Sequence, residues 1–81
     1  MSTTKADLKR WFREGADEGA THMLVITDTF DWSDYPVYVK PGEDAREIAR
    51  KYDDVNMQRI MEVYDLRKSW VEQSKERVFN Y

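Results

Sequence analysis

The sequence contains no cysteine, a single histidine, three glycines and two prolines. Without cysteine it has no disulfides and no thiolate metal ligands, so the framework typical of small secreted proteins is excluded. The longest apolar run, Met23 to Ile26, is far shorter than the roughly 20 residues that cross a membrane. The first residues show no apolar segment behind a basic start. We therefore expect a soluble cytoplasmic protein.

The formal net charge is −3, so an excess of basic groups is also missing. Generic nucleic-acid binding needs such an excess to displace counterions, and we do not expect it here. Aromatic residues, in contrast, are abundant, with 3 Trp, 5 Tyr and 3 Phe in 81 residues. Each buried ring removes roughly 150–250 Å² from water. A chain of this length predicts one small domain, residues 1–81, with an aromatic core.

The first half of the sequence predicts a helix followed by a β-hairpin. A capping pattern and helical spacing of Leu8, Trp11 and Phe12 indicate a helix over 4–18. Residues 21–27 and 36–39 then suit two strands, joined by a tip over 28–34. The first strand has apolar residues on both faces, so we expect it to be covered on both sides or to lie at a subunit contact.

The second half of the sequence predicts two further helices. Ala45, Ile48, Ala49 and Tyr52 form a helical stripe. The apolar spacing beyond it predicts a last helix over 55–77, about 34 Å long, which either breaks near 65–68 or packs on another chain. The fold class expected is therefore α+β, in the order helix, hairpin, helix, long helix. Two strands alone make a weak sheet, so we expect a homo-oligomer, a dimer or larger, that completes the sheet. The terminal Phe79 and Tyr81 should fold back onto the body or a partner.

The hairpin tip is the most chemically distinctive stretch. Asp28, Asp31 and Asp34 are spaced by three, which does not match a calcium loop. Aspartates in this setting usually form turns through bonds to backbone amides, although they can also contact a polar partner. Phe30 and Trp32 lie between them, and these rings either pack into the core or form a binding surface.

No strong catalytic motif is present. His22 lies about 20 Å along an extended strand from the tip aspartates, so a structural role is favoured over a role as general base. The serines lie in no nucleophile elbow, and the glycines form no phosphate loop. We expect no catalytic residue, metal or cofactor, and therefore no enzyme. A metal-dependent hydrolase using the aspartates and His22 is the least favoured reading.

Part of the sequence resembles small proteins encoded in bacteriophage and prophage genomes, whose function is uncharacterised. The similarity covers about residues 15–66 and includes the segment NMQRIMEVYDL. Its remaining residues are Gly19, Ala20, Thr21, His22, Met23, Asp28, Thr29, Phe30, Asp31, Asp34, Tyr35, Pro36, Val37, Tyr38 and Val39. The resemblance implies no catalytic residues. It implies a bacterial host and a stoichiometric action, either on a host protein or on a small molecule.

Two functional hypotheses follow. In the first, an acidic and aromatic hairpin tip binds a bacterial protein through Asp28, Thr29, Asp31, Trp32, Asp34 and Tyr35. In the second, a small ligand such as a nucleotide binds between subunits at Trp32, Tyr38, Lys40, Arg46 and Arg50, because a phosphate needs cations that the tip lacks.

Overall fold

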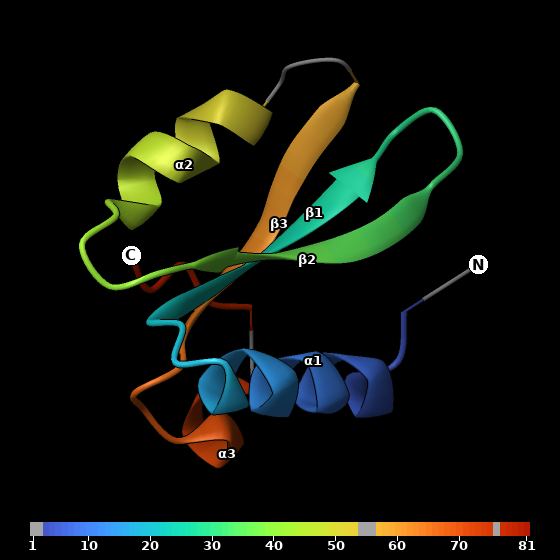
Figure 1. Ribbon diagram of the computed structural model, residues 1–81. Coiled ribbons are helices and arrows are strands. Elements are labelled where there is room, and N and C mark those ends of the chain that lie inside the picture. Colours follow the sequence, from blue (N-terminus) through green and yellow to red (C-terminus); the bar gives the residue numbers. More distant parts are fainter. Residues whose placement is uncertain (1–2, 54–56, 76) are drawn as a thin grey trace.

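The computed structural model describes residues 3–53, 57–75 and 77–81. Figure 1 shows the elements in chain order: α1 (Lys5–Asp17), β1 (His22–Asp28), β2 (Ser33–Val39), α2 (Ala45–Tyr52), β3 (Gln58–Asp65) and α3 (Trp70–Gln73). The predicted α+β class and the initial order of helix, hairpin and helix are confirmed.

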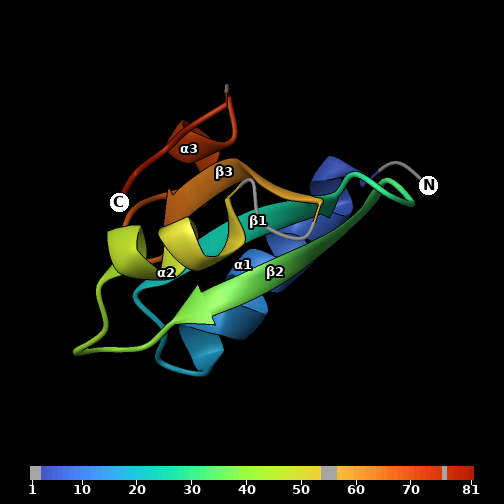
Figure 2. The same ribbon diagram turned by 90° about the horizontal axis from the view of Figure 1, so that it is seen from above.

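The three strands form one antiparallel sheet in the order β2-β1-β3 (Figure 1). Helix α1 lies on one face of this sheet and α2 on the other, an arrangement that Figure 2 shows from above. The central strand β1 is therefore covered on both sides, the first of the two alternatives that its apolar faces predicted. One core lies toward α1 and contains Phe12, Ala20, Met23, Val25, Tyr64 and Leu66. The other lies toward α2 and contains Leu24, Ile26, Val39, Ala45, Ala49 and Val63.

The predicted long last helix is wrong, because residues 58–65 form strand β3. Residues 55, 56 and 76 of the predicted helix lie outside the described residues. The physical reason is a bulge opposite Val25 and Ile26, where β3 carries one extra residue. Residues three apart normally face opposite sides of a strand, but one extra residue returns them to the same side. Ile60 and Val63 thus share the α2-side core, and an apolar spacing of three imitates a helix.

The sequence predicted self-association because two strands alone make a weak sheet, and that reason no longer applies. The third strand comes from the same chain, so the sheet no longer needs a partner to exceed two strands. The outer strand β2 carries Pro36, which cannot donate a backbone hydrogen bond to an added strand. A homo-oligomer stays a prediction that a single chain does not test.

The C-terminal segment folds back onto the body beside β3. Val63 N–H donates to the carbonyl of Val78, and Asn80 N–H donates to the carbonyl of Val63, both at 2.9 Å. The Tyr81 ring lies 5.1 Å from the Arg46 guanidinium carbon, so this terminus reaches α2. The predicted return is confirmed for this backbone, although the Phe79 side chain stays half exposed.

Gly15 explains how closely α1 approaches the sheet. A Cβ atom at this position would lie 2.6 Å from Tyr38 Cε1 and 2.8 Å from Leu66 Cδ1. The Tyr38 hydroxyl also donates to the Trp11 carbonyl at 2.8 Å, which fixes the helix over β2. A glycine that costs helix stability is thus used for packing.

Candidate functional site at the hairpin tip

The hairpin tip is a short turn, 29–32, whose shape is set by Asp31 within it and by Asp28 and Asp34 on either side. The Asp28 carboxylate accepts from the Phe30 amide at 2.8 Å. The Asp31 carboxylate accepts from the amide and the hydroxyl of Ser33, at 3.0 and 2.7 Å. Asp34 accepts from the Thr27 hydroxyl. All three aspartates therefore hold the turn together, the role typical of aspartate in such loops.

The two rings of the tip point away from the core. Phe30 is 79% exposed and Trp32 is 66% exposed. Trp32 has a φ of 59°, and its amide donates to the Asp28 carbonyl at 2.7 Å. Bulky residues rarely adopt this left-handed conformation, which costs free energy. Core packing, one of the two alternatives for these rings, is therefore wrong, and the binding surface stays a prediction.

A negatively charged side chain, Asp31, lies beside the exposed rings of the tip. The bonds from Ser33 lower the pKa of the Asp31 carboxyl, so this exposed side chain stays anionic well below neutral pH. Tyr35 is partly buried beneath the tip, and its hydroxyl accepts from the Gln58 side chain. Burial raises the pKa of Tyr35, which keeps the hydroxyl neutral.

A cleft of about 750 Å³ opens beside the tip. Its walls come from the tip, from the start of β3 and from the C-terminal segment, and they comprise Thr27, Thr29, Trp32, Met57, Gln58, Arg59, Met61 and Arg77. The Thr29 amide and hydroxyl both donate to the Met57 carbonyl, at 2.6 and 2.7 Å, so the tip is tied to the residue that precedes β3. Sequence reasoning missed Met57, Arg59 and Arg77 because it placed them on one long helix.

The residues predicted for the alternative ligand pocket do not meet within one chain. Trp32 precedes β2 and Lys40 follows it, so this seven-residue strand separates them by roughly 25 Å. Tyr38 bonds to α1 on one face of the sheet, whereas Arg46 and Arg50 belong to α2 on the other. Together these two arginines line a small pocket of about 170 Å³, with Ala49, Asp53 and Tyr81. Arg46 also lines a wider hollow of about 540 Å³ beside His22, which Arg50 does not reach.

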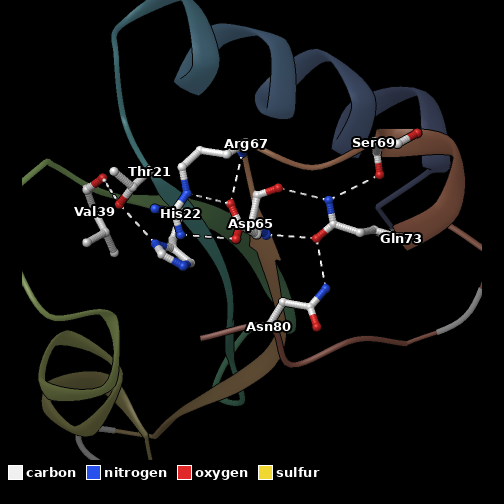
Figure 3. A network of polar contacts seen from close by, with 8 residues as sticks. All are labelled: Thr21, His22, Val39, Asp65, Arg67, Ser69, Gln73 and Asn80. Atoms are coloured by element: carbon white, nitrogen blue, oxygen red, sulfur yellow. Dashed lines mark hydrogen bonds and ion pairs between the residues drawn. The ribbon is translucent and has the colours of Figure 1, made fainter.

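The opposite end of the sheet holds a network of polar side chains (Figure 3). Gln73 is buried and bonds to the backbone of Asp65 in both directions, accepting from its amide and donating to its carbonyl at 2.8 Å. Gln73 also accepts from Asn80 at 2.9 Å and donates to the Ser69 carbonyl at 3.2 Å. The Asp65 carboxylate accepts from Arg67 side-chain nitrogens at 3.0 and 3.1 Å. These contacts join β3, α3 and the C-terminal segment.

His22 belongs to this same end and lies away from the tip aspartates. Its Nδ1 atom lies 2.9 Å from the Thr21 hydroxyl, and its Nε2 atom is buried without a partner among the described residues. Burial lowers the pKa of His22, although the Asp65 charge opposes that shift. Across the described ranges, no group of three histidine or carboxylate side chains is placed to hold a metal ion. A metal-dependent hydrolase built from the aspartates and His22 therefore gains no support.

Comparison with protein-family models, with curated proteins and with solved structures gave no significant match. No helix within residues 3–53, 57–75 and 77–81 is long and apolar enough to cross a membrane.

Proposed function

We propose that this chain is a non-enzymatic binding protein that attaches stoichiometrically to a bacterial protein through its hairpin tip. The observation that carries this proposal is the exposure of Phe30 and Trp32 on a turn that aspartate side chains hold in place. A fixed turn loses little conformational freedom on binding, so aromatic rings on it contribute efficiently to affinity.

The chemistry of the tip indicates the kind of partner. Two rings call for an apolar pocket on the partner, and the exposed Asp31 carboxylate beside them calls for a basic group at the rim of that pocket. Asp28, Thr29, Asp34 and Tyr35 support the turn or line its base and hold these groups in position.

The setting proposed is the bacterial cytoplasm during phage or prophage growth. This part of the proposal depends on the resemblance to small phage-encoded proteins over about residues 15–66. An accessory protein of that kind acts by occupying a host protein, which agrees with an exposed docking turn and with the lack of a catalytic motif in the sequence.

Site-specific photocrosslinking inside bacteria tests the proposal. A photoreactive phenylalanine analogue is placed at Phe30, and in a control chain at Val71, which is 63% exposed in α3. We expect one host protein to crosslink from Phe30 but not from Val71. The same adducts from both positions, or adducts only with a second copy of this chain, would contradict docking of a host protein at the tip.

The captured protein is then purified and its affinity measured by calorimetry. Trp32→Ala should weaken binding by about 2 kcal/mol, the size typical of a central aromatic residue. Asp34→Ala should also weaken binding, because it removes the acceptor of the Thr27 hydroxyl at the base of the turn. Val71→Ala should leave the affinity unchanged. Equal affinities for all of these variants would overturn the proposal.

A further inference from the structure

We infer that the cleft beside the tip binds a small anion that carries a planar ring, with the chemistry of a nucleoside monophosphate. The inference goes beyond protein docking and concerns a different surface, with Trp32 the one ring that both share. It places the ligand within a single chain, against Arg59 and Arg77, rather than between subunits.

The cleft supplies cations in a chain that is acidic as a whole. Arg59 and Arg77 line it, and among the described residues of its lining none carries a carboxylate. Arg77 donates one bond to the Met61 carbonyl at 3.2 Å, and its guanidinium carbon lies 6.0 Å from the Phe79 ring. Neither arginine forms an ion pair with a described carboxylate. Two guanidinium groups at one cleft suit a phosphate, whose oxygens accept from their paired donors.

The cleft also supplies a surface for a flat ring. The indole of Trp32 is largely exposed, and Met57 and Met61 add soft apolar contacts to the same lining. Aromatic side chains stack on nucleobases without needing a particular base. The lining is therefore mixed, with three apolar side chains beside polar and charged ones, which suits a ligand that has both a flat ring and a charge. The volume of about 750 Å³ lies within the common range of small-molecule sites.

The remaining polar side chains of the cleft offer acceptors, and Gln58 also keeps its second amide hydrogen as a donor. The Thr27 hydroxyl donates its hydrogen to Asp34, and the Thr29 hydroxyl donates to the Met57 carbonyl. The Gln58 amide nitrogen donates to the Tyr35 hydroxyl. Each of these three side chains therefore has oxygen lone pairs left over for a donor on the ligand. Sugar hydroxyls and exocyclic ring amines are such donors.

The backbone around the cleft holds an unusual conformation. Among the described residues other than glycine, only Trp32 and Met57 have positive φ, at 59° and 61°. Both line the cleft, and the Thr29 bonds to the Met57 carbonyl join the two walls. Strained residues persist where the surroundings hold them, and they concentrate at binding sites.

A ligand titration followed by NMR tests the inference. Adenosine monophosphate, adenosine and inorganic phosphate are added separately to ¹⁵N-labelled protein. The indole N–H signal of Trp32 is assigned by its loss in Trp32→Phe. We expect adenosine monophosphate to shift this signal together with amides of 57–61, and to bind more tightly than adenosine or phosphate alone. No shift at about 10 mM, or equal binding of phosphate and nucleotide, would overturn the inference.

Matched variants separate this site from the docking site. Arg59→Gln and Arg77→Gln should each weaken nucleotide binding about tenfold or more, because each removes a charge-assisted bond. Arg13→Gln, an exposed arginine on α1, should have no effect. Phe30→Ser should reduce docking of the captured protein but leave nucleotide binding intact. Nucleotide binding that fails equally in Arg13→Gln, or that survives both cleft variants, would contradict the site, whatever the outcome for docking. Amide spectra of each variant confirm that it is folded.

Discussion

The two ends of strand β1 differ in the burial and hydrogen bonding of the side chains around them. At the His22 end, the strand partners are Val39 and Asp65, and the buried Gln73 and the Asp65 backbone bond to each other, whereas His22 Nε2 has no partner among the described residues. At the Asp28 end, the partners are Ser33 and Gln58, and large apolar side chains, Phe30 above all, point into solvent. One strand of seven residues thus joins a closed end to an open end.

This difference predicts which residues stabilise the fold and which residues bind a partner or ligand. Groups at the closed end have few ways to be satisfied except by one another, so removing one leaves others buried and unpaired. Groups at the open end have water or a ligand as an alternative, so removing one costs the fold little. Substitutions should accordingly divide into those that unfold the protein and those that abolish binding.

The largest effect is expected from Gln73→Leu at the closed end. This change leaves the amide and carbonyl of Asp65 without their side-chain partner in a buried site. We expect the free energy of unfolding to fall by about 3 kcal/mol in urea denaturation. Gln58→Leu is the matched change at the open end, where one bond to Tyr35 is lost, and should cost about 1 kcal/mol. Equal losses would remove the distinction between the ends.

Gly15→Ala should have the next largest effect, through the packing of α1 on the sheet. The added methyl group would meet the Tyr38 ring and the Leu66 side chain at less than van der Waals distance. We expect a loss of about 2 kcal/mol despite the better helix propensity of alanine, measured by thermal and urea unfolding. Asp17→Ala, on an exposed position of the same helix, is the control and should change stability little. A stabilised Gly15→Ala protein would show that α1 lies farther from β2.

A smaller effect is expected from acid at His22. Its pKa in the folded protein lies below the ordinary value of 6.5, chiefly because of burial. Below pH 6.5 the unfolded chain binds a proton at His22 more readily than the folded chain does. The free energy of unfolding should therefore decrease as the pH falls below 6.5. His22→Gln should lack this slope. NMR titration of the ring gives the pKa directly, and a midpoint at or above 6.5 would refute the assignment.

The smallest change in stability is expected at the tip. Phe30→Ser should leave the free energy of unfolding within about 0.5 kcal/mol of the parent value, as is usual for an exposed position. The same variant should lose affinity for the captured host protein. A marked loss of stability, seen by urea denaturation, would mean that the ring packs on the body.

The sequence predicted α1, the hairpin and α2 because each has a local signal. The capping pattern at Thr4 and Asp7 is present as expected, and the strand pairing follows from a hairpin of neighbouring segments. Strand β3 has no such signal, because the bulge at 60–62 converts its alternation into a spacing of three. A periodicity argument cannot distinguish this pattern from a helix.

The candidate site was also predictable only where its residues are close together in the sequence. The exposed tip lies within one continuous stretch, so its residues could be named before the fold was known. The cleft joins Trp32 to Arg59 and Arg77, which are far apart in sequence. Placing them together requires the β1 and β3 pairing and the return of the C-terminal segment, neither of which local spacing predicts.

The most direct test of the open end is the solvent exposure of Trp32 in a chain that keeps only this tryptophan. Trp11→Phe with Trp70→Phe removes the two partly buried indoles that pack at the α1-side core. Acrylamide should then quench the remaining fluorescence nearly as well as it quenches a free indole in water, and nucleotide should reduce that quenching. Fluorescence protected from acrylamide in the unliganded, folded protein would contradict an open tip.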